Sequence, residues 1–290
     1  MSPGHGETIM TPPQIEFFKM SAAGNDFILF DNRSGTLRRD DFPDLVRRLC
    51  TRALSVGADG VILLGSSTVA HVRVSFFNPD GAPTFCGNGA RCASRLAYLQ
   101  GIAPARMTVE TAVMVHRAEV KGALVSFEMR DPQGFDDAVE VRTGNETIRG
   151  SFVDTGVPHF VVFRAIPEHD SIHDLGRVLR MHPRFAPSGT NVNFVEPGGD
   201  GVLAIRTYER GVEGETLACG TGCVAAAIAA VASGKAEAPV SLRTRSGALV
   251  RVRFEGPPKR ASGVRLEGEA RLVYVGQLTE EATQGFQPRT

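Results

Sequence analysis

The sequence lacks a net charge, because its 32 lysines and arginines balance its 32 aspartates and glutamates. Proteins that bind nucleic acid usually carry a basic patch, and solvated arms usually carry charge of one sign. The chain also lacks an apolar run of the roughly 20 residues that a membrane-spanning helix requires. These absences predict no nucleic-acid partner and no membrane partner.

The N-terminal segment lacks the cationic start and the apolar stretch of a secretion signal. We therefore expect residues 1–13 to form a flexible tail and the protein to be cytoplasmic. A CxxC motif is also missing, and the five cysteines are an odd number, which argues against a disulfide framework. Five residues separate Cys86 from Cys92, more than the roughly two to four of a typical zinc site. No metal is expected.

What the sequence has in abundance is short apolar segments, divided by 32 glycines and 17 prolines. The apolar spacing predicts a helix over Asp40–Ala53. Two more helices are expected after Cys86 and Cys219, and Gly101 and Gly234 are suited to the left-handed position after their ends. Segments rich in β-branched and aromatic residues predict strands at 27–31, 60–64, 72–77, 159–163, 192–196, 203–208, 250–254 and 271–276.

The two halves of the sequence repeat each other. Five landmarks recur in the same order after a nearly constant shift, the pairs being Gly24 and Gly156, Gly57 and Gly189, Phe77 and Tyr208, Cys86 and Cys219, and Gly101 and Gly234. Such a series indicates a duplicated unit. We expect an α+β fold of two pseudo-symmetric domains, each a mixed or antiparallel sheet wrapped around a central helix. The N-terminal domain would comprise residues 14–131 plus 274–290, and the C-terminal domain residues 132–273.

In each half a cysteine stands where a helix is expected to begin. Cys86 is followed by Gly87, Asn88 and Gly89, and Cys219 is followed by a second Gly-polar-Gly step. The positive end of a helix stabilises a thiolate, and its free N–H groups can hold a carboxylate. If the domains face each other, one cysteine can take a proton from a carbon while the other protonates its opposite face. This arrangement predicts inversion of a stereocentre without a cofactor.

Other candidate residues have an ordinary interpretation as well. Cys50, Cys92 and Cys223 are expected to be small buried residues. Taken alone, His159 beside a proline at the start of a strand favours a surface or loop position. Glu209 and Arg210 are compatible with an ordinary solvated pair, but their place in the second repeat, opposite Asn78 in the first, favours a functional role.

Six segments together resemble the diaminopimelate epimerase family: "GNDFILFD", "GADGVILL", "FFNPDG…FCGNGARC", "GVPHFVVF", "TNVNFVE" and "YERGVEGETLACGTGC". The resemblance runs from about Phe17 to about Val275. It implies a homodimeric, cofactor-independent epimerase that interconverts LL- and meso-2,6-diaminopimelate, an amino acid on the route to lysine and peptidoglycan.

The resemblance also implies roles for individual residues. Cys86 and Cys219 match the catalytic cysteines. His159 matches a histidine that lies near them and, with Glu209, tunes them. The resemblance implies that the remaining matches bind substrate: Asn25, Asn78, Gly87, Asn88, Asn191, Glu209, Arg210, Gly220 and Thr221. Of these, the loop residues Gly87, Asn88, Gly220 and Thr221 would hold the carboxylate of the reacting centre.

One departure concerns the identity of the substrate. The family usually has asparagine before the Pro-His pair, and this chain has Val157. A racemase of another amino acid, such as histidine, therefore remains an alternative. A lyase or dehydratase on the same scaffold, and a non-enzymatic redox or binding protein, are further alternatives.

Overall fold

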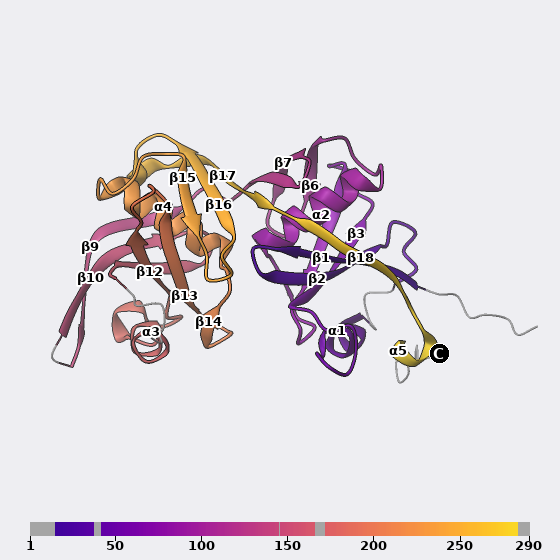
Figure 1. The fold of residues 1–290 in the computed structure, drawn as a ribbon, viewed down its shortest axis with the longest axis horizontal. Helices are drawn as coiled ribbons and strands as arrows, with labels where there is room; N and C mark the ends of the chain where they lie inside the picture. Colours follow the sequence, from indigo (N-terminus) through magenta and orange to yellow (C-terminus); the bar gives the residue numbers. More distant parts are fainter. Residues whose placement is uncertain (1–14, 38–41, 145, 166–171, 284–290) are drawn as a thin grey trace, which may run out of the picture.

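The molecule consists of two lobes that lie side by side (Figure 1). The computed structural model describes residues 15–37, 42–144, 146–165 and 172–283, so the expected flexible tail over residues 1–13 lies outside the described residues. In this part of the chain eighteen strands are joined by hydrogen bonds into one continuous sheet. None of the described helices is both long enough and apolar enough to cross a membrane.

The first half of the chain builds the N-terminal lobe, on the right in Figure 1. Its elements are β1 (Ile15–Ala22), β2 (Asn25–Asp31), α1 (Phe42–Cys50), β3 (Gly60–Gly65), β4 (Val72–Phe77), β5 (Pro83–Thr84), α2 (Gly87–Leu99), β6 (Arg106–Glu110), β7 (Val115–Lys121) and β8 (Leu124–Glu128).

The C-terminal lobe repeats this order of strands and helices. Its elements are β9 (Gln133–Thr143), β10 (Glu146–Asp154), β11 (Pro158–Phe163), α3 (His173–Arg180), the 3₁₀ turn η1 (Pro183–Phe185), β12 (Asn191–Pro197), β13 (Leu203–Glu209), β14 (Gly214–Thr216), α4 (Gly220–Ala232), β15 (Val240–Arg243), β16 (Leu249–Glu255), η2 (Pro258–Arg260) and β17 (Ser262–Glu269). The chain ends with β18 (Arg271–Leu278) and α5 (Glu280–Thr283).

Two strand pairings link the halves. β18 returns from the C-terminal lobe and pairs antiparallel with β1 (Figure 1), and β8 pairs antiparallel with β17. β9 pairs antiparallel with β10 within the C-terminal lobe. The pairing of β18 with β1 begins at Arg271, three residues before the expected boundary at residue 274. The division into 14–131 plus 274–290 and 132–273 stays a proposal.

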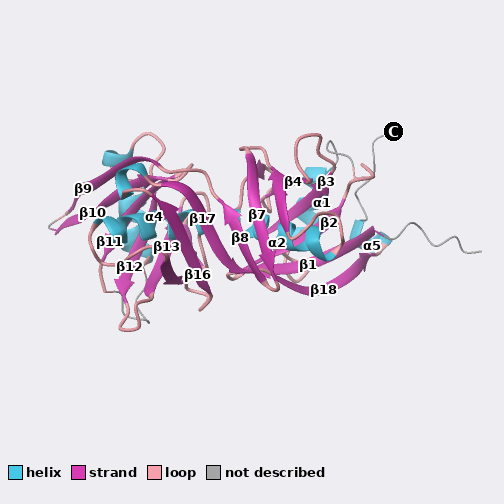
Figure 2. Cartoon of the chain, turned by 90° about the horizontal axis from the view of Figure 1, so that it is seen from above, coloured by secondary structure: helices cyan, strands magenta, loops and turns pink. Residues whose placement is uncertain are grey.

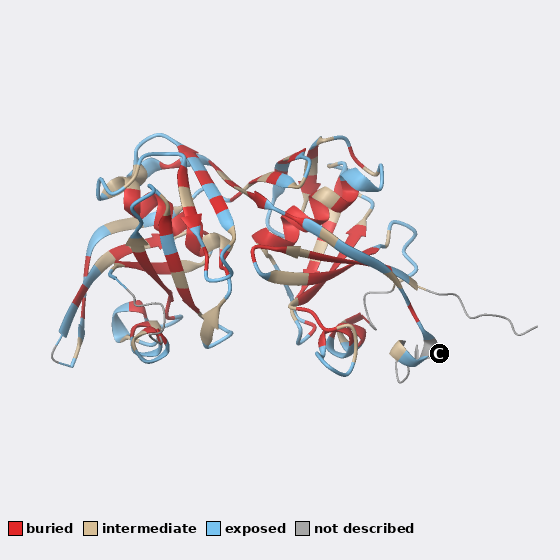
Figure 3. Cartoon of the chain, in the orientation of Figure 1, coloured by how far each residue is buried: buried red, intermediate tan, exposed pale blue. Residues whose placement is uncertain are grey.

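One helix fills the centre of each lobe, and both central helices are largely buried (Figures 2 and 3). α2 lies against β1–β4, β7 and β8, while α4 lies against β10–β13 and β15–β17. The alanines of α4 are small enough for strands to close around almost the whole helix. Gly101 and Gly234 follow these helices at φ +65° and +66°. The expected two-domain α+β fold is confirmed.

A second helix in each lobe covers the outer face of the sheet. α1 ends at Cys50, three residues before the end of the expected helix over Asp40–Ala53, whose first two residues lie outside the described part of the chain. It buries Phe42 and Leu45 as the spacing predicted. α3 was not expected from the sequence. It has only eight residues, half of them polar, and buries only Gly176 and Leu179 among those described. A helix this short carries too little periodicity to be recognised without its tertiary contacts.

Candidate active site

Cys86 lies at the N-terminus of the central helix of the first lobe. Its backbone is extended (φ −136°, ψ 116°), and its Sγ accepts a hydrogen bond from the backbone N–H of Gly89 at 3.4 Å. The sulfur therefore takes the place of the side-chain oxygen that usually caps a helix. The side chain is half-buried.

Cys219 occupies the same place in the second lobe, with nearly the same backbone (φ −127°, ψ 110°). Its side chain makes no capping bond to the helix, and its Sγ lies 3.4 Å from Oγ1 of Thr221. The residue is 8% exposed. The two thiols thus have the same backbone setting but different hydrogen-bond partners.

The two helix starts lie against one another. A Cβ placed on Gly220 would be 3.4 Å from Oδ1 of Asn88, across the boundary between the halves. The same side chain, Leu266 of β17, lies 3.7 Å from a Cβ placed on Gly87 and 3.0 Å from one on Gly220. Glycine at these positions leaves the space that a substrate group needs to reach both rows of N–H groups.

A chain of amides extends from α2 into the first lobe. Asn88 donates from Nδ2 to Oδ1 of Asn25 at 2.7 Å, and Asn25 donates from Nδ2 to Oδ2 of Asp59 at 3.0 Å. Among the described residues, Oδ1 of Asn88 is buried without a hydrogen-bond partner. This oxygen is positioned to accept from a substrate ammonium group. Asp59 lies in the "GADG" segment, but nothing in the sequence had indicated a place for it in the site.

His159 is fully buried in β11, so the surface position that its sequence context favoured is wrong. Asn193 donates from Nδ2 to Nδ1 of His159 at 3.0 Å and accepts at Oδ1 from Thr207 at 3.0 Å. Nδ1 is thus an acceptor, which assigns the proton of the neutral ring to Nε2. Nε2 has no partner among the described residues. Burial lowers the pKa of His159 to about 3, so the ring is neutral at physiological pH.

Asn191 organises the chain around the end of β13. Its Oδ1 accepts from the backbone N–H of Arg210 at 2.9 Å, and its Nδ2 donates to the carbonyl of Pro158 at 3.0 Å. The Arg210 side chain donates to the carbonyl of Ser188 at 3.4 Å, whereas Glu209 accepts from the hydroxyl of Thr216 at 2.9 Å. The two neighbouring charged side chains therefore have separate partners.

Asn78 lies in the turn after β4, where its backbone N–H donates to the carbonyl of Ala82 at 2.9 Å. It is half-buried and has the place in the first lobe that Glu209 has in the second. Burial raises the pKa of Glu209, and the negative charge of Asp59 in the other lobe raises it further. The end of β13 therefore lies within electrostatic reach of the amide chain.

Burial dominates the charge state of both thiols. It raises the pKa of Cys86 to about 11 and that of Cys219 well above its usual value, and the carboxylate of Glu209 acts in the same direction on both. The N–H of Gly89 opposes this shift at Cys86 and the hydroxyl of Thr221 opposes it at Cys219, but both are smaller effects than burial. The helix N-termini alone do not make thiolates of these residues before a substrate binds.

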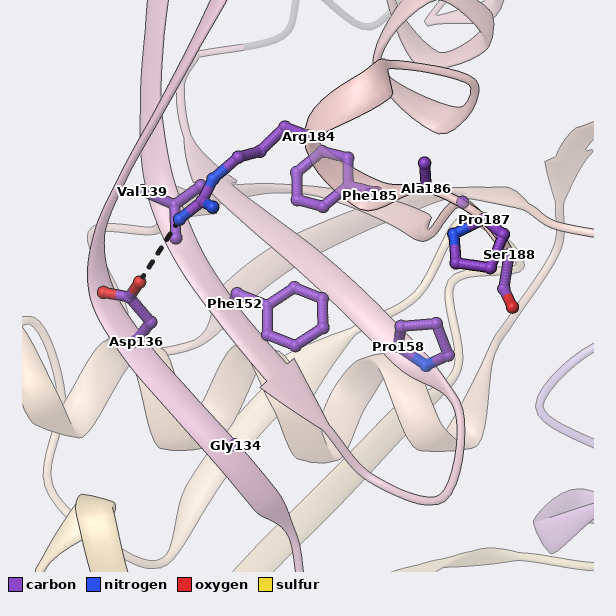
Figure 4. A pocket seen from close by; sticks show the side chains of 11 residues that line it. Gly134, Asp136, Val139, Phe152, Pro158, Arg184, Phe185, Ala186, Pro187 and Ser188 are labelled. Atoms are coloured by element: carbon purple, nitrogen blue, oxygen red, sulfur yellow. Dashed lines mark ion pairs between the residues drawn. The ribbon is translucent and has the colours of Figure 1, made fainter.

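A cavity of about 370 Å³ lies in the C-terminal lobe (Figure 4), and its lining includes Pro158 and Ser188, whose carbonyls accept from Asn191 and Arg210. Arg184 and Asp136 form an ion pair of 3.8 Å at its side. Neither Cys86 nor Cys219 is among its lining residues, so the cavity borders the residues around Asn191 and not the thiols.

Comparison with known proteins identifies the family of the chain. The family model described as "Diaminopimelate epimerase" matches residues 17–132 and 151–271. The chain belongs to the diaminopimelate epimerase family. A protein named diaminopimelate epimerase from Hydrogenobaculum sp. (strain Y04AAS1) is 42% identical over 276 residues, covering 91% of this chain and 98% of that protein. One of the same name from Aquifex aeolicus (strain VF5) is 40% identical over 282 residues, covering 93% and 100%.

Solved structures more distant in sequence share the fold of this diaminopimelate epimerase family member. A phenazine biosynthesis protein of the PhzF family from Bacillus anthracis superposes with a TM-score of 0.70 at 16% identity, over 92% of this chain and 99% of that one. A hydroxyproline epimerase from Agrobacterium vitis gives 0.68 at 17% identity, over 93% of each chain. Proteins with different names therefore share this two-lobed fold.

Proposed function

We propose that this protein interconverts LL- and meso-2,6-diaminopimelate without a cofactor, with Cys86 and Cys219 as the two acid–base groups. One observation carries the proposal: each half contributes a cysteine at the start of its buried central helix, and those helix starts meet where Asn88 approaches Gly220. Relatives named diaminopimelate epimerase over nearly their whole length support this substrate.

The reaction moves one proton at each face of the α-carbon. A thiolate on one side takes the α-proton and becomes a thiol, while the electron pair of the broken C–H bond delocalises toward the substrate carboxylate. The thiol on the other side then donates its proton to the opposite face and becomes a thiolate. The carbon is inverted, and the reverse reaction uses the same groups in exchanged roles.

The helix starts stabilise the charge that develops on the carboxylate. The backbone N–H groups after Cys86 and Cys219 are preorganised, and burial removes the water that would weaken them. Because burial also favours the protonated form of both thiols, one of them transfers its proton to solvent water as the substrate enters. The ammonium group next to the α-carbon supplies a positive charge that favours the remaining thiolate.

The second amino-acid end of the substrate requires different groups. Arg210 offers a planar fork for a carboxylate, and Glu209 can accept from an ammonium group. Asn78 and Asn191 can bind either group while staying neutral. His159 is held by Asn193, which lies against Gly222 near the start of α4, and it presents a neutral Nε2–H on that side of the site.

We also propose a homodimer in the cytoplasm. The outer edge of β18 has no partner strand among the described residues, and three consecutive apolar residues on it, Val273, Tyr274 and Val275, are about half exposed. Such an edge favours association with a second copy. Five free cysteines favour a reducing compartment. Sedimentation should show a dimer in the wild type and a monomer in Tyr274→Asp.

The decisive experiment follows α-hydrogen exchange by NMR in deuterated, reducing buffer without added cofactor. LL-diaminopimelate should acquire deuterium at one α-carbon and yield the meso form, while L-histidine, L-proline and L-glutamate exchange far more slowly. Exchange with a different amino acid alone would assign the racemase alternative. Loss of water or another group, seen as a change of product mass, would assign the lyase or dehydratase. A reversible Cys86–Cys219 disulfide without turnover of any substrate would assign the protein as a redox or binding protein.

A further inference from the structure

Arg91 lies on the second turn of α2 and is the largest fully buried side chain of the molecule among those described. None of its three side-chain nitrogens has a hydrogen-bond partner within the described residues. Burial lowers the pKa of the guanidinium, but an arginine keeps its proton in a protein. An unpaired cation in this position is unfavourable for folding, so its presence needs a reason.

The guanidinium lies between the two central helices. Its Cζ and one terminal nitrogen are 3.4 Å from the position that a Cβ on Gly268 would take, in the strand that joins the lobes. Its positive charge acts on three thiols: Cys86 and Cys92 of its own half, and Cys223 on α4 of the other. Arg91 is therefore placed behind the helix starts, at their shared boundary.

The charges that face Cys86 come from two sides. Glu209, at the end of β13, disfavours the thiolate of Cys86, and Arg91, from α2, favours it. Glu209 also disfavours the thiolate of Cys219, on which Arg91 is not among the groups that act. The position in α4 that matches Arg91 is Val224 in the repeat. The buried cation is thus specific to the half that contains Cys86.

We propose that Arg91 is a positioning residue for the epimerisation proposed above: a permanent charge, left without hydrogen-bond partners, whose field favours the thiolate form of Cys86. A guanidinium bound to a carboxylate would have its field largely cancelled by its partner. Without one, its whole charge acts on the thiols nearby. The unpaired buried charge lowers the folding stability and raises the reactivity of Cys86.

The test compares Arg91→Met and Arg91→Lys with the wild type. Arg91→Met removes the charge and keeps an unbranched apolar side chain, so its melting temperature should equal or exceed that of the wild type. The pH midpoint of Cys86 alkylation by iodoacetamide, read by peptide mass spectrometry, should rise by about one unit, and kcat/KM should fall about tenfold. The Cys219 midpoint should move less, and Arg91→Lys should restore both properties.

Arg95→Met is the matched control. Arg95 lies on the next turn of α2, but its side chain donates to the carbonyls of Gly122 and Ala270. Its loss should leave both alkylation midpoints unchanged. If Arg91→Met lowers melting temperature and activity together without moving the Cys86 midpoint, Arg91 is structural and the proposal is wrong. If Arg91→Met does not fold, Arg91→Gln removes the charge in its place: a raised Cys86 midpoint in this variant supports the proposal, and an unmoved one contradicts it.

Alkylation requires no substrate, so the proposal for Arg91 is tested even if the wild type fails to epimerise diaminopimelate. A wild type without turnover but with a charge-dependent Cys86 midpoint would reject the proposed substrate and keep the role of Arg91. Turnover of diaminopimelate by the wild type, with a Cys86 midpoint that Arg91→Met leaves unchanged, would keep the proposed substrate and reject the role of Arg91.

Discussion

The two halves of the molecule share a backbone but differ in the polar groups they bring to the site. Strand register places Phe27 opposite Gly60 in the first lobe and His159 opposite Asn191 in the second. It also places Phe77, the residue before Asn78, in the position of Tyr208, the residue before Glu209. Apart from Asp59, the N-terminal half contributes neutral amides, whereas the C-terminal half adds ionisable side chains to the amides of Asn191 and Asn193.

This difference fits a reaction that treats the two faces of one carbon alike within a site whose other groups differ on the two sides. In the proposed mechanism the reacting carbon needs an acid–base group on each face, and both halves have a cysteine at the start of the central helix. Recognition of the rest of the proposed substrate needs unlike groups, and at those positions the halves differ. We infer that the duplication kept the acid–base pair and left the surrounding positions to determine specificity.

The sharpest way to break the comparison is to remove one thiol at a time. Cys86→Ala and Cys219→Ala should each lower kcat/KM for epimerisation by roughly a thousandfold or more, a loss of at least about 4 kcal/mol of transition-state stabilisation. Each face of the carbon then lacks its acid or base. The measurement is the rate of meso-diaminopimelate formation by NMR.

Cys50→Ala is the control, because Cys50 is buried in the outer cluster beneath α1. It should change the rate less than about threefold, since it touches no group of the site. Retention of more than a tenth of the activity by either catalytic variant would show that one face does not need its own thiol.

The next largest difference between the halves is expected when glycines on the first turns of α2 and α4 are replaced by alanine. A Cβ on Gly222 would lie 2.4 Å from Oδ1 of Asn193, whereas a Cβ on Gly89 would meet Ile62 Cδ1 at 3.0 Å. Gly222→Ala should therefore disrupt the support of His159 and cost about 2–4 kcal/mol of unfolding free energy. Gly89→Ala should cost about 1 kcal/mol, because the end of an apolar side chain can move. Urea unfolding of both variants measures the difference, and equal losses would contradict it.

Buried His159 makes the free energy of unfolding depend on pH. Phe27, which has the matching position in the N-terminal half, does not titrate. The His159 pKa of about 3 lies below the unfolded value of 6.5. As the pH falls from about 6.5 toward 3, the unfolded chain binds a proton that the folded protein does not. The stability present above pH 6.5 is therefore lost at up to about 1.4 kcal/mol per unit.

Urea unfolding at pH 7, 5 and 4 should show this loss in the wild type and a smaller slope in His159→Gln. His71→Gln is the control, because His71 is exposed, and it should keep the slope of the wild type. An unchanged slope in His159→Gln would mean that the ring is protonated in the folded protein.

The smallest effect is expected at Val157, which the repeat aligns with Asn25. Val157→Asn would restore the amide usual in the family at a half-buried position. We expect the KM for diaminopimelate to change by less than about tenfold and kcat by less than about threefold, since one polar contact is worth about 1 kcal/mol. Val157→Leu separates shape from polarity. A loss of turnover in Val157→Asn would mean that valine is required here.

Local patterns were sufficient for much of the architecture. The spacing of Phe42 and Leu45 predicted α1, and Gly101 and Gly234 predicted the helix ends, because these signals depend on neighbouring residues. The short α3 was missed because packing, not periodicity, stabilises it. Asp59 and Asn193 were also missed, since each acquires its role only through a partner more than thirty residues away.

The sequence by itself determined the duplication, the central helices and the cysteine at the start of each, because repeats and capping patterns are properties of local chemistry. Only the tertiary structure decided how those cysteines are charged. Burial raises the pKa of Cys86 to about 11, against the pull of the helix N-terminus, and His159 is held neutral in the core. Desolvation depends on everything packed around a group, and no stretch of neighbouring residues carries that information.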